Sequence, residues 1–223
     1  MPDLEFALPK PASGSGRYDY LLNGEATGVE ESFDVVGDDG GWQLTSVRTA
    51  PGGTELRADV SATGDRDATC TLSFRSEEID RITAEYTLAN GALSVAMNEA
   101  EPSVVTAEVL GAAVLSPLLR VFQGPTVAAT IRVGGRRPVV IPRLDPTDAA
   151  TLLTPTVDIR TAEPLGVDAV GTGDEEVPWR HCRYVGGNYD DSADFWLDDA
   201  DRLVRYRFPQ SPEQLWEVEL TID

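Results

Sequence analysis

The stretch GVEESFDVVGDDGGWQLTSV, residues 28–47, decides how this chain folds. Apolar side chains recur at every second position before the turn-forming DDGG, and the alternation resumes behind it. One face of the first segment carries Val29, Glu31, Phe33 and Val35, and one face of the second carries Trp42, Leu44 and Ser46. A period of two is typical of strands with one buried face, so the stretch predicts an antiparallel hairpin.

The same rhythm extends in both directions from this hairpin. Turns rich in Gly, Asn and Asp separate the segments at spacings of about 8–12 residues. Further strands are predicted at 17–22, 55–61, 68–75, 82–88, 92–97 and 104–108, and then at 126–133, 136–142, 156–161, 166–171, 177–185, 193–197, 203–208 and 215–222. The sequence therefore predicts an all-β fold, either an antiparallel spiral β-roll or a partly open barrel.

One segment interrupts the rhythm. Residues 109–122 are almost continuously apolar, and Ser116-Pro117 divides them. We expect a short helix over Ala107–Leu115 and a second short or irregular stretch to Gln123. An apolar segment between two sets of strands must be buried against the sheet. The run is shorter than the roughly 20 residues that cross a bilayer, so no membrane insertion is expected.

The domain prediction follows from these elements. Residues 1–16 contain Pro, Ser and Gly and are expected to form a flexible leader. Residues 17–223 are predicted to form a single β-roll domain. A faint echo between residues 74–82 and 195–203 leaves open that two similar halves are joined by a helical segment at 107–123.

The charge of the chain excludes several partners. Of 223 residues, 38 are acidic and 18 basic, which gives a net charge of −20. Nucleic-acid binding depends on Lys and Arg that neutralise phosphates, so it is excluded, and the same field repels anionic membrane surfaces. Lys10 is the sole lysine, which, with abundant Ala, Gly, Val and Asp, indicates a GC-rich bacterial or archaeal source.

No motif points to a cofactor or a metal. The first residues have neither the charged nor the apolar region of a signal peptide, and Cys70 and Cys182 form no CxxC or zinc framework. We therefore expect a cytoplasmic protein with two free, buried thiols. A P-loop, GxSxG and HExxH are absent, and the aspartates over 190–201 lack the spacing of a calcium loop.

His181 is the only histidine, so any imidazole-based acid–base chemistry would use it. Neighbouring Cys182 cannot pair with it, because adjacent residues of a strand point to opposite faces. Trp179 and Arg183 share the face of His181, and this mixture of apolar area and donors suits a sugar or an anionic head group. Tyr189, in the Gly-rich loop that follows, could close over such a ligand. The alternative is a half-exposed strand followed by an ordinary hairpin loop.

Two stretches resemble a known group of proteins. RYDYLLNGEATG, residues 17–28, is similar to the start of uncharacterised bacterial spiral β-roll domains. The ending from Phe195-Trp196-Leu197 to Leu203-Val204-Arg205-Tyr206 is similar to their final hairpin. This group includes proteins labelled glycolipid-binding. The shared motifs are structural, so the resemblance implies a fold and a ligand class and transfers no functional residue.

Together these observations predict a non-enzymatic module that binds an amphipathic ligand such as a lipid or glycolipid. Its pocket would lie between the curved sheet and the helical segment, with a rim formed by Trp179, His181, Arg183 and Tyr189. Two other functions stay open. A sheet face could bind another chain or a second copy of this one, or paired carboxylates could support hydrolysis at a separation that sequence does not reveal.

Overall fold

The computed structural model describes residues 6–38, 40–98, 103–105, 112–170, 177–186 and 189–223. Within these residues, sixteen strands form one continuous sheet, accompanied by a 3₁₀ turn and one α-helix. The elements are β1 Phe6–Ala7, β2 Gly14–Leu22, β3 Glu25–Asp38, β4 Gly41–Ala50, β5 Thr54–Thr63, β6 Asp67–Arg75, β7 Ile82–Ala89, β8 Ala92–Met97, β9 Ser103–Val104, β10 Ala113–Leu115, η1 Arg120–Phe122, α1 Gln123–Arg132, β11 Arg136–Pro142, β12 Pro155–Val170, β13 Val177–Gly186, β14 Tyr189–Leu197, β15 Leu203–Ser211 and β16 Gln214–Ile222.

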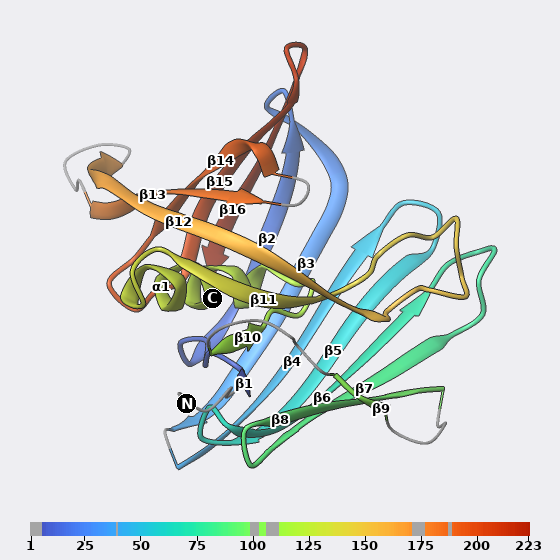
Figure 1. The fold of residues 1–223 in the computed structure, drawn as a ribbon. Helices are drawn as coiled ribbons and strands as arrows, with labels where there is room; N and C mark the ends of the chain where they lie inside the picture. Colours follow the sequence, from blue (N-terminus) through green and yellow to red (C-terminus); the bar gives the residue numbers. More distant parts are fainter. Residues whose placement is uncertain (1–5, 39, 99–102, 106–111, 171–176, 187–188) are drawn as a thin grey trace.

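Two antiparallel meanders make up the sheet. Strands β2 to β9 follow one another in space as in sequence, and β11 to β16 do the same. The last strand, β16, pairs with β2 and so joins the two meanders, while β1 and β10 add in parallel beside β11. Figure 1 shows a strongly curved sheet in which the long β2 and β3 run between the two halves. The predicted all-β fold with a short helical segment is confirmed.

The predicted hairpin at residues 28–47 is formed by β3 and β4. Phe33 pairs with Ser46, and Val35 pairs with Leu44. All four side chains are buried, as is that of Trp42. The alternation therefore turns one face of each strand into a core that both meanders share.

The helical segment lies later in the chain than predicted. Ala113–Leu115, assigned to a helix from its sequence, forms β10, and residues 106–111 lie outside the described ranges. The helix is α1, which includes most of the stretch predicted as a strand at 126–133. No helix in the described ranges is long and apolar enough to cross a membrane. The strand predicted at 156–161 and residues 166–170 of the next predicted strand belong to one bulged strand, β12; residue 171 lies outside the described ranges.

Burial explains why α1 is a helix despite its strand-like alternation. The hydroxyls of Thr126 and Thr130 donate to carbonyl oxygens four residues back, those of Phe122 and Thr126, each at 2.8 Å. These bonds satisfy polar groups of β-branched residues inside a helix. A Cβ on Gly124 would lie 2.2 Å from the carbonyl oxygen of Asp201, so the missing side chain allows α1 to lie directly against the β14–β15 turn.

The prediction of a flexible leader is wrong for residues 6–16. Phe6 lies in β1 with 6% of its surface exposed, and Leu8 is fully buried. The N–H of Phe6 donates to the carbonyl of Gly91 at 3.1 Å, and the N–H of Leu8 donates to that of Asp65 at 2.8 Å. The Pro- and Gly-rich composition describes a turn-prone arm, but two apolar side chains anchor it to the opposite half of the sheet.

Candidate functional site

A cavity of about 230 Å³ lies between the inner side of the curved sheet and the helical segment. Three arginines from separate parts of the fold line it: Arg48 on β4, Arg120 in η1 and Arg160 on β12. Its other polar lining side chains include Ser116, Gln123 and Thr126, and its apolar ones include Leu118, Ile141 and Leu144. Guanidinium groups beside apolar surface in one small space suit a ligand that is both negatively charged and partly apolar.

Arg48 reaches the cavity because it continues the inner face of β4. Leu44 and Ser46 are buried at the preceding inner positions, and the period of two places Arg48 on the same side. Its Nη1 donates to the carbonyl oxygen of Leu118 at 3.4 Å, which links the sheet to the segment before η1. In the strand register Arg48 lies directly opposite Glu31 of β3.

Arg120 begins η1 and is positioned over two aromatic rings. Its guanidinium carbon lies 5.5 Å from the ring centroid of Tyr20 and 4.8 Å from that of Tyr206. Both tyrosines are buried, so the attraction between cation and ring is little screened by water. The two rings therefore hold the charge of Arg120 at the wall of the cavity.

Arg160 is 6% exposed on the inner side of β12. One of its terminal nitrogens lies 3.2 Å from a carboxylate oxygen of Asp158, and another donates to the carbonyl of Gly186. Its guanidinium also lies 5.7 Å from the ring centroid of Tyr184. These contacts fix the third positive charge, which the partly exposed Asp158 balances in part.

Glu31 is the fully buried carboxylate beside these arginines. It accepts hydrogen bonds from the hydroxyl of Tyr20 and from the backbone N–H of Val121, both at 3.1 Å. Burial raises the pKa of Glu31 above its ordinary value of 4.5, and the nearby charges of Arg48 and Arg120 reverse only part of that rise. Ionisation of Glu31 therefore sets the charge balance of the cavity.

Positively charged side chains gather at this cavity, in a chain whose net charge is −20. The guanidinium groups of Arg48, Arg120 and Arg160 line it, and the carboxylates of Glu31 and Asp158 lie beside them. Where water is largely excluded, guanidinium groups attract an anion more strongly than they would at the surface. Planar guanidinium groups match the paired oxygens of carboxylates and phosphates.

The predicted binding residues lie on the other side of β13. Cys182 and Tyr184 are buried in the core, so His181 and Arg183 point to the opposite face, as does Trp179. The predicted rim around a pocket between sheet and helix is therefore wrong for Trp179 and His181. The period of two was assigned correctly, but the helical segment covers the face that carries Cys182.

His181 is held between two carboxylates on the outer face. Its Nε2 lies 3.0 Å from Asp194 of β14, and its Nδ1 lies 3.4 Å from Asp168 of β12. Its ring stacks on that of Trp196, with centroids 4.6 Å apart and planes 7° apart. The indole N–H of Trp196 donates to Asp168 at 2.8 Å. This cluster cross-links three strands, and Trp196 is only 7% exposed, so its ring is not available to a ligand.

Charged side chains continue the cluster across the next two strands. Arg205 and Arg207 lie 5.7 and 6.0 Å from the ring centroid of Trp196. Both also contact Glu217 of β16, at 2.8 and 2.6 Å. Burial alone would raise the pKa of Glu217, but the hydrogen bonds and charges of Arg207 and Arg205 outweigh it and leave that pKa below its ordinary value. These contacts between charged and aromatic side chains on neighbouring strands stabilise the sheet from β12 to β16.

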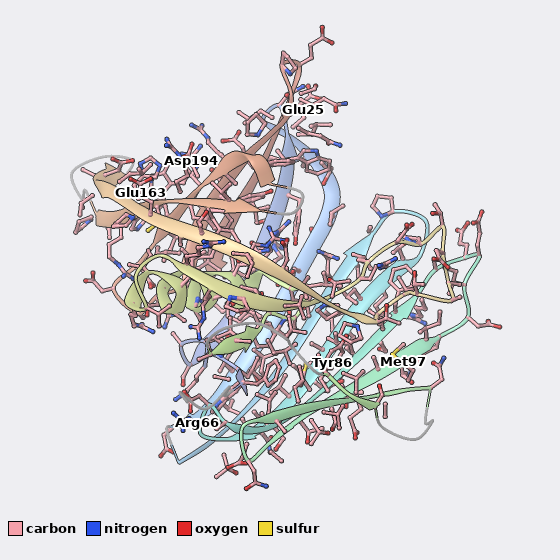
Figure 2. All side chains as sticks on the ribbon, viewed as in Figure 1. Glu25, Arg66, Tyr86, Met97, Glu163 and Asp194 are labelled. Carbon is pink, nitrogen blue, oxygen red and sulfur yellow. The ribbon has the colours of Figure 1, made fainter. Side chains whose placement is uncertain are left out.

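The other two predicted binding residues are Arg183 and Tyr189. Arg183 is exposed and lines a different groove, of about 420 Å³, with Ile131, Gly134 and Glu163. Figure 2 shows Glu163 and Asp194 in the half of the sheet that contains β12 to β16. Tyr189 begins β14, but its side chain lies outside the described part of the chain, so its role stays a prediction.

Sequence reasoning did not identify the arginines or the carboxylate of the cavity, although a signal existed for Glu31 and Arg48. Glu31 interrupts the apolar face of the strand at residues 28–36, and Arg48 ends that of the strand at residue 42 onward. A charged group at an inner position requires an opposite charge nearby. Arg120 had no such signal, because it lies outside any periodic segment.

The described ranges contain no group of three or more His, Cys, Asp or Glu side chains placed to hold a metal ion. Cys70 and Cys182 are free and buried, as expected from the sequence. Burial raises the pKa of both thiols. They are therefore protonated at neutral pH and are poor nucleophiles.

Comparisons with known proteins bear on the fold. No family model and no curated protein matches the chain. Among solved structures, it is similar to the crystal structure of a β-barrel-like protein of domain of unknown function DUF1849 from Brucella abortus. The two share 9% sequence identity with a TM-score of 0.54, over 96% of this chain and 98% of that one. The chain thus has a fold similar to that of an uncharacterised bacterial β-barrel-like protein.

Proposed function

We propose that this protein is a non-enzymatic module that binds a small amphipathic anion in the cavity between sheet and helical segment. The observation that carries the proposal is the convergence of Arg48, Arg120 and Arg160 on one cavity that also has apolar walls. The arginines would hold a carboxylate or phosphate head group. Leu118 and Leu144 would contact the apolar part of the ligand.

The size of the cavity defines the ligand further. Its volume of about 230 Å³ lies below the roughly 300–1,000 Å³ of most small-molecule sites. A head group with a short tail fits this space, whereas a whole lipid or glycolipid is larger. The resemblance implies a lipid or glycolipid ligand. We therefore retain only the chemistry that a smaller ligand shares with these molecules, a polar head group attached to an apolar chain.

The placement of reactive groups supports binding rather than catalysis. His181, the single histidine, lies on the outer face in contact with Asp168 and Asp194. The acid beside the cavity, Glu31, already accepts two hydrogen bonds. Hydrolysis by paired carboxylates and partner binding by a sheet face have weaker support, because the outer-face cluster around His181 is engaged internally.

The proposal is tested by isothermal titration calorimetry with hexanoate and hexyl phosphate at constant ionic strength. Arg120→Gln should weaken binding at least about tenfold, since a hydrogen bond to a charged group contributes about 1.5–3 kcal/mol. Arg57→Gln is the matched control, because Arg57 on β5 is partly exposed and does not line the cavity. Its guanidinium pairs with the carboxylate of Asp59 at 2.6 Å. Native mass spectrometry of protein purified from its host would reveal a ligand that is already bound.

Binding of at least one probe by the wild-type protein, lost in Arg120→Gln and retained in Arg57→Gln, is the supporting result. If neither probe binds at millimolar concentration, the proposal is wrong. Equal weakening by the two substitutions would also contradict it, because it would indicate a general charge effect on an acidic protein.

A further inference from the structure

The connection between β11 and β12, residues 143–154, is a closed loop with a narrow base. At the base, the N–H of Arg143 donates to the carbonyl of Thr154, and the N–H of Leu153 donates to the carbonyl of Arg143, both at 2.8 Å. Internal bonds from Thr147 to Asp145 stabilise its tip. Compact loops whose ends meet in this way are frequently functional.

The loop reaches across to the other half of the molecule through two leucines. Leu152 and Leu153 are fully buried in the shared core, whereas most other residues of the loop are exposed or half-buried. The hydroxyl of Tyr86, on β7, donates to the carbonyl of Leu153 at 2.5 Å. Figure 1 shows the loop extending from β11 over β5 to β7, and Figure 2 shows Tyr86 in that half of the sheet.

Leu153 has a backbone conformation that leucine rarely adopts. Its φ is 62°, in the left-handed region. The other non-glycine residues with positive φ in the described ranges are Asn23, Asn90, Asn98 and Asp201, all types that tolerate it. The strain at Leu153 therefore persists because burial and hydrogen bonds hold it, and strain held in this way is found at functional sites.

The same loop forms part of the cavity wall. Leu144, at its start, lines the cavity together with Arg48 and Arg160. Leu152 and Leu153, at its end, belong to the core cluster that contains the inner side chains of β5 to β8. Outward movement of the loop would therefore remove Leu144 from the wall of the cavity and uncover the apolar core side chains that Leu152 and Leu153 now cover.

We propose that residues 143–154 form a displaceable plug and that the apolar surface beneath Leu152 and Leu153 is a binding site for the acyl chain of a single-chain amphiphile. The proposal rests on the proposed function, because the anionic head of the same molecule occupies the arginine-lined cavity. While no ligand is bound, the side chains of Leu152 and Leu153 occupy the space that the acyl chain would fill. A long ligand replaces them and releases the strained conformation of Leu153.

The test compares hexyl phosphate with dodecyl phosphate, below its critical micelle concentration, for wild type, Tyr86→Phe and Leu153→Gly. Tyr86→Phe removes the hydroxyl bond to the plug, and Leu153→Gly removes one of its apolar side chains. Both should tighten dodecyl phosphate binding several-fold and leave hexyl phosphate unchanged. Thr45→Val, which removes an exposed hydroxyl on β4 that donates to Asp59 at 3.0 Å, is the control and should alter neither affinity.

Hydrogen exchange on the wild-type protein provides a second measurement that no variant can confound. Dodecyl phosphate should speed exchange of the N–H groups of Leu153 and Thr154, and hexyl phosphate should not. Equal effects of the substitutions on both ligands, or unchanged exchange with bound dodecyl phosphate, would overturn the plug alone. Failure of both ligands to bind wild type would instead overturn the proposed function, and the plug with it.

Discussion

Replacement of Glu31 by Gln tests the charge balance of the cavity most directly. The amide is nearly the same size as the carboxylate and can still accept from the N–H of Val121, which now donates at 3.1 Å. Burial raises the pKa of Glu31 above 4.5 more than Arg48 and Arg120 lower it. The folded protein therefore holds this proton more tightly than the unfolded chain does.

The sign of the pH effect on stability follows from this difference in proton binding. As pH rises from about 4.5 through the raised pKa, Glu31 must ionise in the folded state at a cost, so its contribution to the free energy of unfolding falls. Each unit by which the pKa is raised corresponds to about 1.4 kcal/mol. Glu31→Gln lacks this loss, so the variant should gain stability relative to wild type as the pH rises.

The same substitution should strengthen anion binding where Glu31 is ionised. A carboxylate about 8 Å from a bound anion repels it by about 2 kcal/mol at an effective dielectric constant of about 20, which is roughly 30-fold in affinity. Urea unfolding between pH 4 and 9 measures stability, and calorimetry with hexanoate at pH 5 and pH 9 measures binding. The ratio of variant to wild-type affinity should rise towards that limit as the pH rises through the raised pKa of Glu31. Weaker binding by the variant at pH 9, or parallel stability curves, would refute the reasoning.

Three further outcomes are expected. Gly124→Ala should lower the free energy of unfolding by about 1–3 kcal/mol in thermal or urea unfolding despite the better helix propensity of Ala, because its Cβ would overlap backbone atoms of the β14–β15 turn; neutral behaviour would show that α1 can shift. Glu217→Gln should cost about 1–2 kcal/mol at pH 7, and urea unfolding should show this difference shrinking as the pH falls below about 4.5, because Arg207 stabilises the ionised carboxylate. His181→Ala should lower the free energy of unfolding by about 1 kcal/mol, because the stacking on Trp196 is lost, and should leave the affinity for hexanoate unchanged. A large loss of affinity would show that His181 contributes to the binding site.

The local sequence pattern was sufficient to predict most strands, but it did not predict the position of the helical segment. Strands such as β6 and β7 were predicted within about two residues, because alternation with one buried face has a single backbone solution. Thr126–Val133 alternates equally well, yet it forms α1. The buried surroundings of this segment, and the hydroxyl bonds of Thr126 and Thr130, outweighed its strand-like pattern.

The candidate site could be predicted from the sequence only in part, for the same reason. The pattern correctly separated His181 from Cys182 on β13, but it could not say which face the helical segment would cover. Arg48 and Arg160 come from strands on different sides of the molecule. Their meeting depends on the curvature of the whole sheet, which no local spacing records.

By itself, the sequence determined that this chain is an acidic, all-β protein of alternating strands and short turns, because side-chain period and turn chemistry are local properties. Only the tertiary structure decided that β16 closes on β2, that α1 lies inside the resulting curve, and that three arginines converge there around a buried acid. These features depend on contacts between residues far apart in the chain, where desolvation and charge act through space.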